Sequence, residues 1–421
     1  MLSYWRRASL TRREDAALAQ ISDIRSAPTP EFIESVRARF PTEAEIDRVL
    51  TRKMKARAGP GYSPLSLDQV VEGVRSLIAS EHGGDFAISN PRWLQGGASK
   101  IQIAFELDWT GPEGGARRTD SLALRMQPPE SIVETSRRRE FEVIKAMDGV
   151  IPVPPCFWID PDGSHLPYPS ILYGFVEGVS RPSKAPVTKV SGVGTNFGPE
   201  LRPVLARQFV EALTRIHKPS EAQLAQMPSF DKVETGSTDA MLRQLNWWRR
   251  VWEEDRPCDL PLVDVAYRWL VENAVPLDHV SVVHGDFRAG NFLYSEESQK
   301  ITAWLDWELA VLGDRHQDLC WATGGHFGHY SEDGTTFLAC GLLPAEEMFE
   351  LYEKLSGLTV DPVRLKYFRV LNDFMSTVHM LASAWRVARL GKTHQDVTVA
   401  WLSMIGNGIA GHLAATLEEV I

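Results

Sequence analysis

Two short polar segments near residue 300, each set among apolar residues, constrain the fold of this chain most. The first reads HGDFRAGN from His284 to Asn291, and the second reads LDWE around Asp306. Valine, isoleucine, phenylalanine and leucine flank both segments, which is typical of short buried strands. We therefore expect a rigid apolar frame that presents Asp286, Asn291 and Asp306 in one cleft.

These three side chains supply what the transfer of a phosphoryl group requires. An aspartate such as Asp286 can accept the proton of an attacking hydroxyl and orient it in line with the phosphorus. The amide oxygen of Asn291 and the carboxylate of Asp306 are hard donors of the kind that Mg²⁺ prefers. A lone His-x-Asp is typical of an ordinary turn, but the spacing to Asn291 and Asp306 favours a catalytic site. We interpret His284 as structural, holding the loop by hydrogen bonds.

Residues 85–178 predict a small sheet with a phosphate-binding loop. From Ile101 to Leu107 large apolar residues alternate with polar or small ones, which is the period of a strand. Arg125 lies in a later strand and Glu140 in the next helix, the order in which kinases place a phosphate-binding cation and the acid that holds it. The alternative for this pair is a surface ion pair of little energetic value. The loop before Ile101 has small residues that let backbone N–H groups approach phosphate oxygens: Gly96, Gly97, Ala98 and Ser99.

Outside this sheet the sequence is mostly helical. Residues 1–84 have helical periodicity, with capping-box patterns at Thr42/Glu45 and at Ser66/Gln69. Residues 179–421 open with a long polar loop and continue as helices, interrupted by a β-like island at 280–306. A chain of 421 residues exceeds the usual size of one core. We predict an α+β protein with a helical extension (1–84), a sheet lobe (85–178) and a helical lobe (179–421), and a ligand cleft between the lobes.

The order of these motifs resembles the aminoglycoside/choline-kinase-like phosphotransferase family, whose fold is similar to that of protein kinases. His284 to Asn291 looks like the family's catalytic loop, and Asp306 looks like its metal-binding aspartate. The resemblance extends over roughly residues 85–400. It implies a two-lobed, protein-kinase-like fold and a site for a nucleoside triphosphate with Mg²⁺.

The segment ILYGFVEG at 171–178 looks like the family's interlobe hinge, which implies that Tyr173 and Phe175 lie at the nucleobase. A finer similarity connects the chain to kinase domains fused to some acyl-CoA dehydrogenases, through LRMQPP at 124–129, REF at 139–141 and LDWELA at 305–310. Such domains are associated with phosphorylating hydroxyacyl substrates. The chain departs from the wider family by having Arg125 where most kinases have lysine, yet an arginine stays charged and binds phosphate in a fork. The extension of 84 residues is a second departure.

Two further groups of residues have ordinary interpretations. His316, His326 and His329 suggest metal binding, but no acidic or thiol partner stands at a firm spacing from them. We interpret these histidines as lining solvent or the substrate cleft. The run Arg137-Arg138-Arg139 is typical of a solvated helix face.

The composition limits the partners. A formal net charge of −10 argues against a broad nucleic-acid-binding face. No stretch of about 18 apolar residues predicts a membrane span, and the N-terminal residues lack the apolar core of a signal peptide. The four cysteines form no Cys-x-x-Cys pair and suit a reducing cytoplasm. We expect a cytoplasmic protein without nucleic-acid or membrane partners.

The resemblance therefore implies a kinase that moves the γ-phosphoryl group of ATP or GTP, with Mg²⁺, to the hydroxyl of a small molecule. A hydroxyacyl-CoA or related metabolite is the first candidate acceptor, and an aminoglycoside or other antibiotic is the second. The alternative from another class is a catalytically silent kinase-fold protein that binds a nucleotide or a partner. The motifs leave open the acceptor, the choice of ATP or GTP, the oligomeric state and the role of residues 1–84.

Overall fold

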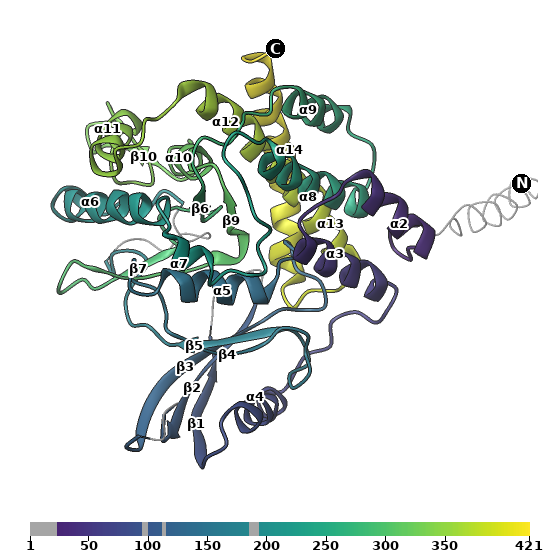
Figure 1. Ribbon diagram of the computed structural model, residues 1–421, viewed down its shortest axis with the longest axis vertical. Coiled ribbons are helices and arrows are strands. Elements are labelled where there is room, and N and C mark those ends of the chain that lie inside the picture. Colours follow the sequence, from purple (N-terminus) through teal and green to yellow (C-terminus); the bar gives the residue numbers. More distant parts are fainter. Residues whose placement is uncertain (1–22, 95–99, 112–114, 185–192) are drawn as a thin grey trace, which may run out of the picture.

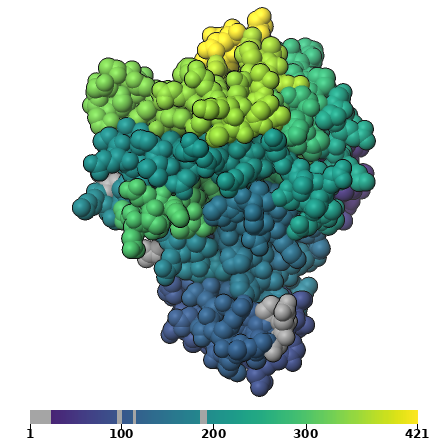
Figure 2. All heavy atoms as spheres, turned by 60° about the vertical axis from the view of Figure 1, so that its left-hand side comes forward, coloured from purple at the N-terminus to yellow at the C-terminus, as the bar shows by residue number. Residues whose placement is uncertain are grey.

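The chain folds into a small sheet lobe and a larger helical lobe (Figure 1). The computed structural model describes residues 23–94, 100–111, 115–184 and 193–421. In the space-filling view the sheet lobe forms the narrow lower part and the helical lobe the broad upper part (Figure 2). The predicted α+β, two-lobed architecture is confirmed.

The sheet lobe is built on five antiparallel strands in the order β1-β2-β3-β5-β4. The alternation seen from Ile101 to Leu107 lies in β2, whose Ile101, Ile103, Phe105 and Leu107 are buried. Helix α5 (Arg137–Met147) follows the third strand and lies between the sheet and the helical lobe (Figure 1). The strands are β1 (Phe86–Trp93), β2 (Ile101–Trp109), β3 (Arg118–Met126), β4 (Cys156–Asp160) and β5 (Ser170–Gly174).

The helices of the N-terminal extension divide between the two lobes. Helix α4 (Leu67–Glu81) packs its buried apolar face on the sheet, and its predicted capping box between Ser66 and Gln69 is present. Helices α2 (Pro30–Arg39) and α3 (Ala44–Ala56) instead pack on the helical lobe beside α8 (Asp239–Asp255) (Figure 1). The capping box predicted at Thr42/Glu45 is wrong, because Glu43 is the N-cap of α3 and Glu45 binds Arg48 and Ser136 instead.

Buried ion pairs fix α3 to the rest of the protein. Arg57 lies 2.7 Å from both Glu130 and Asp255, and its side chain is fully buried. Lys53 pairs with Glu254 at 2.9 Å and with Asp255 at 3.2 Å. Burial would raise the pKa of Asp255, but Arg57 and Lys53 outweigh it and hold that pKa at about 2. The extension is therefore an integral part of the described structure.

Within the described residues, the helical lobe contains two large apolar cores and the predicted β-like island. Strands β6 (Ser281–Val283) and β9 (Val311–Gly313) pair antiparallel, as do β7 (Phe292–Tyr294) and β8 (Ile301–Trp304). A short pair, β10 (His329–Tyr330) and β11 (Phe337–Leu338), lies farther along. The other helices of this lobe are α6 (Gly198–Ile216), α7 (Glu221–Leu224), α9 (Pro261–Glu272), α10 (His316–Ala322), α11 (Ala345–Ser356), α12 (Pro362–Val378), α13 (Trp385–Arg389) and α14 (Asp396–Glu418), with short 3₁₀ and π turns at η1 (Trp307–Leu309) and η2 (His379–Ala384).

Helix α14 carries an unusual exposed apolar face. Its side chains Val397, Trp401, Met404 and Ile405 are exposed, although other residues of the helix pack on η2 and α12. By length and composition it is the one helix of the described ranges that could cross a membrane. Core helices of soluble proteins meet the same criterion, so the expected absence of a membrane partner stays a prediction.

Candidate active site

The loop between β6 and β7 is held by buried hydrogen bonds that shape it around His284 and Gly285. The Asp318 carboxylate on α10 accepts from the backbone N–H of His284 at 2.7 Å and of Gly285 at 2.9 Å. His284 is fully buried; its Nε2 lies 3.0 Å from the Leu305 carbonyl oxygen, and its Nδ1 accepts from the N–H of Asp286. His284 is thus a structural residue, as its sequence context predicted.

Gly285 occupies a position that no other residue fits. Its φ of 81° lies in the left-handed region, and an added Cβ would stand 2.7 Å from the Leu309 carbonyl oxygen. The close approach brings the loop 284–291 against the turn that follows Asp306. The glycine therefore sets the distance between the two polar segments.

Asp286 is oriented by three donors. Its Oδ1 accepts from Arg288 Nε and from Trp321 Nε1, both at 2.7 Å, while its Oδ2 accepts from Asn291 Nδ2 at 2.7 Å. The Asp286 side chain is only 16% exposed, so these bonds fix the carboxylate where it is largely shielded from solvent. Phe327 completes the surroundings: its ring packs at a tilt against Trp321, and its centroid lies 5.1 Å from the Arg288 guanidinium.

Asn291 and Asp306 fit a site for a hard divalent cation. The Asn291 amide nitrogen is committed to the carboxylate and carbonyl oxygens of Asp286, which leaves its amide oxygen to act as a ligand. The backbone carbonyl of Asn291 bonds to the N–H of Leu305, so the two polar segments are joined next to Asp306. The Asp306 side chain is 32% exposed. The donors present are oxygens, the class that Mg²⁺ prefers.

Asp306 has a strained backbone and a strong cationic partner. Its φ of 68° and ψ of 47° are left-handed, which is rare for a residue other than glycine and is often found at functional sites. Its Oδ1 lies 2.5 Å from the Arg125 guanidinium, which also contacts Glu140 at 3.3 Å. The predicted pair between β3 and α5 is therefore present, and it is buried rather than superficial. Burial opposes the charge on Arg125, but Asp306, Glu140 and Glu308 outweigh it and raise its pKa well above its usual value.

Glu308, two residues after Asp306, organises three cations. It contacts Lys100 at 2.8 Å, Arg125 at 3.2 Å and Arg137 at 3.0 Å. Burial would raise the pKa of Glu308, but the three cations outweigh it and hold that pKa well below its ordinary value. The roles of Glu308 and Lys100 were not predicted from the sequence, although both residues stand in quoted motifs, the LDWE segment and the end of the glycine-rich loop.

Two of the three arginines of the run on α5 are buried. Arg137 contacts Glu140 and Glu308 and its side chain is fully buried. Arg139 is 3% exposed and pairs with Glu43 at 2.6 Å. The prediction holds for Arg138, which is exposed, and is wrong for Arg137 and Arg139, because α5 lies between the lobes and beside the N-terminal extension.

Two buried histidines support α10. His217 is fully buried and lies 3.3 Å from the Asp318 carboxylate, and its burial lowers its pKa. His316 is also fully buried, and its Nδ1 lies 2.6 Å from Asp314. The expectation that His316 lines solvent or the cleft is therefore wrong. Asp314 and Asp318 are recognisable as structural residues only from their contacts with His316 and His217 in the folded protein.

The remaining predicted nucleotide contacts are only partly described. Gly96, Gly97, Ala98 and Ser99 lie outside the described residues. Tyr173 is in β5, and burial raises its pKa to about 12. The N–H of Phe175 donates to the Ser121 carbonyl at 2.8 Å, so this group is engaged in the sheet lobe.

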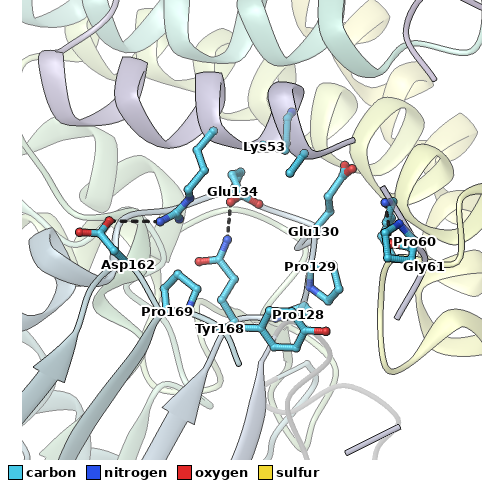
Figure 3. Close-up of a pocket in the computed structure, with 14 residues that line it drawn as sticks. Lys53, Pro60, Gly61, Pro128, Pro129, Glu130, Glu134, Asp162, Tyr168 and Pro169 are labelled. Carbon is cyan, nitrogen blue, oxygen red and sulfur yellow. Dashed lines mark hydrogen bonds and ion pairs between the residues drawn. The ribbon is translucent and has the colours of Figure 1, made fainter. Parts of the chain in front are cut away.

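A pocket of about 280 Å³ lies away from these residues, between α3 and the segment that joins β3 to α5 (Figure 3). Lys53 and Glu130 line it beside the ion pairs of the extension, and Glu134 meets Gln127 across it. None of the lining residues belongs to the loop 284–291 or to the LDWE segment. The pocket is therefore separate from the candidate active site.

Residues 113–355, more than half of the chain, match the phosphotransferase enzyme family (APH). The chain belongs to this family. The match includes Arg125, Glu140, Asp286, Asn291 and Asp306. The resemblance that these motifs carried in the sequence is therefore confirmed.

Curated relatives and solved structures agree with the family. The chain is 25% identical over 303 residues to acyl-CoA dehydrogenase family member 10 of Mus musculus, covering 69% of this chain and 27% of that protein. It is 29% identical over 207 residues to family member 11 of Gallus gallus, covering 44% of this chain and 26% of that protein. The chain thus matches about a quarter of the length of these relatives. A solved Ralstonia eutropha protein assigned to the aminoglycoside phosphotransferases has a TM-score of 0.57 at 18% identity, covering 83% of this chain and 98% of that one.

Proposed function

We propose that this protein transfers the γ-phosphoryl group of ATP or GTP, with Mg²⁺, to the hydroxyl group of a small molecule. The observation that carries the proposal is the Asp286 carboxylate, which Arg288, Trp321 and Asn291 hold by hydrogen bonds of 2.7 Å. A carboxylate fixed in this way can orient a hydroxyl and accept its proton without reorganisation of the site.

In the proposed reaction a new bond forms between the acceptor oxygen and the γ-phosphorus. The bond between that phosphorus and the oxygen bridging it to the β-phosphate breaks, and the nucleoside diphosphate leaves with the electron pair. The hydroxyl proton passes to the Asp286 carboxylate. Mg²⁺, held by Asn291 and Asp306, would neutralise phosphate charge. Arg125, anchored by Glu140, stands beside Asp306 and would contact the phosphate oxygens.

A hydroxyacyl acceptor, such as a hydroxyacyl-CoA, is the acceptor that the surroundings favour. Beside Asp286 lie Arg288, Trp321 and Phe327, which are cationic or aromatic, whereas a cationic antibiotic is favoured by an acidic surface. The relatives are acyl-CoA dehydrogenase family members by name, which supports an acyl-type acceptor.

The exposed face of α14 supports the same acceptor class. Trp401, Met404 and Ile405 are exposed at helical spacing, and His412, two turns beyond Ile405, meets His326 edge to face beside Phe327. This apolar stripe therefore ends next to the residues around Asp286. We propose that it carries the acyl chain of the acceptor, because burying an exposed apolar stripe stabilises a complex by about 25 cal/mol per Å².

The first test compares the wild type with Asp286→Asn. Nucleotide turnover is measured with Mg²⁺ and with hydroxyacyl-CoA esters, hydroxy acids or aminoglycosides as acceptors. Turnover is expected to rise with hydroxyacyl acceptors and to fall about 10²- to 10⁴-fold in Asp286→Asn. Asp333→Asn, an exposed aspartate in the β10–β11 turn, is the matched control and keeps full activity.

Two outcomes would change the conclusion. If the protein neither binds nor turns over a nucleotide, it is a kinase-fold binding protein. If only aminoglycosides raise turnover, the acceptor assignment is wrong.

Met404→Glu, at a side chain 75% exposed, tests the apolar stripe on α14 and is expected to raise KM for long-chain acceptors only. Val363→Glu, 64% exposed at the start of α12, is its control.

A further inference from the structure

Three metal-ligating side chains that are far apart in the sequence meet in the helical lobe. His326 follows α10, Asp373 lies on α12 and His412 lies on α14. One imidazole nitrogen of each histidine and one carboxylate oxygen all lie within 4.8 Å of one another. The two imidazole rings are 4.8 Å apart between centroids.

The cluster has a supporting partner on the same helix as one of its histidines. Asp373 is only 8% exposed, and its Oδ2 accepts a hydrogen bond of 2.7 Å from Thr416. Thr416 stands four residues after His412 on α14, so both side chains face α12. Carboxylates that bind metals are commonly oriented by such a second hydrogen bond. The buried carboxylate is therefore fixed, while the two exposed histidines can adjust.

We propose that His326, Asp373 and His412 bind a transition-metal ion, and that Zn²⁺ fits this donor set best. Two imidazoles and one carboxylate with a fourth position left for water form a common zinc arrangement, whereas Mg²⁺ prefers oxygen ligands. Zinc bonds of about 2.0–2.2 Å place tetrahedral ligands about 3.3 Å apart. The histidines reach this spacing by side-chain rotation, since both are exposed.

The site is separate from the proposed Mg²⁺ ligands and has its own consequence. His326 precedes Phe327, which packs on Trp321 and lies over Arg288. An ion at the cluster would join this loop to α12 and α14. It would thereby fix the aromatic side chains beside Asp286.

The experiment titrates the whole, metal-stripped protein with Co²⁺, followed by visible absorption, and then with Zn²⁺ in competition. We expect one equivalent of Co²⁺ with the intense spectrum of a tetrahedral site, displaced by Zn²⁺ and not by Mg²⁺. His412→Ala and His326→Ala are expected to weaken binding at least about tenfold, and Thr416→Val by about ten- to a hundredfold. Melting curves without metal establish that each variant is folded.

His329→Ala is the matched control, because His329 lies in the same loop region but outside the cluster, bonded to the Tyr330 carbonyl. It is expected to bind Co²⁺ like the wild type. The proposal is overturned if the wild type takes up no stoichiometric Co²⁺, or if folded His412→Ala binds as tightly as the wild type.

Discussion

Glu308→Gln removes one carboxylate from a site that holds three cations and three carboxylates. The cations are Lys100, Arg125 and Arg137, and each contacts Glu308 at 2.8–3.2 Å. Two carboxylates remain after the substitution, and Asp306, one of them, is partly exposed. The variant therefore leaves one cationic charge uncompensated among residues that are at most 7% exposed.

The magnitude follows from the cost of breaking a buried ion pair, which is about 3–5 kcal/mol when one partner is removed. Lys100→Met removes a cation instead, and the remaining Glu308 keeps both guanidinium groups. It loses the 2.8 Å ion pair to Glu308 and the hydrogen bond to Ser131, so we expect a cost of about 1–3 kcal/mol. The double variant restores the balance of charge and is expected to be at least about 1 kcal/mol more stable than the sum of the single effects.

Urea unfolding followed by tryptophan fluorescence measures these differences at pH 7. The lowered pKa of Glu308 means that its contribution is present above the ordinary value of 4.5 and is lost as the pH falls through the lower folded value. The difference between wild type and Glu308→Gln is therefore expected to be constant from pH 6 to 8 and to shrink in acid. A Glu308→Gln loss below about 1 kcal/mol, or strict additivity in the double variant, would refute the reasoning.

Three further predictions test other parts of the structure. Trp321→Phe loses the 2.7 Å hydrogen bond to Asp286, so we expect kcat to fall about 10- to 100-fold with the nucleotide KM retained; an unchanged kcat would contradict this. Arg57→Ala leaves Glu130 and Asp255 without their shared cation, so we expect urea denaturation to show a loss of about 3–5 kcal/mol in the free energy of unfolding. The control, Arg52→Ala, removes a side chain that is 32% exposed and should cost no more than about 1 kcal/mol. Burial lowers the pKa of His379 from 6.5 to about 4. Below pH 6.5 the unfolded state therefore binds a proton that the folded state does not, and the free energy of unfolding falls by up to about 1.4 kcal/mol per pH unit. His379→Gln should flatten this slope between pH 4 and 6.5, and equal slopes for the variant and the wild type would refute the prediction.

The sequence by itself determined the family, the two-lobed fold and the residues of the candidate active site. Asp286, Asn291 and Asp306 were readable because a catalytic loop needs specific residue types at short, fixed spacings. The pairing of Arg125 with Glu140 was also predictable, since a strand followed by a helix has few ways to pack. The capping box at Ser66 was a local signal, and local signals survive folding when nothing else competes for the side chain.

The tertiary structure decided what each charged or polar residue does outside those motifs. Glu45, a capping residue by its local pattern, is drawn to Arg48 and Ser136 instead. Arg137 looked solvated by its neighbours in sequence, yet it is buried against Glu308, which is 171 residues away. His326 had no nearby partner in the sequence, and only the packing of α12 against α14 brings Asp373 and His412 to it. Burial and pairing depend on contacts between distant segments, and residue spacing carries no information about those contacts.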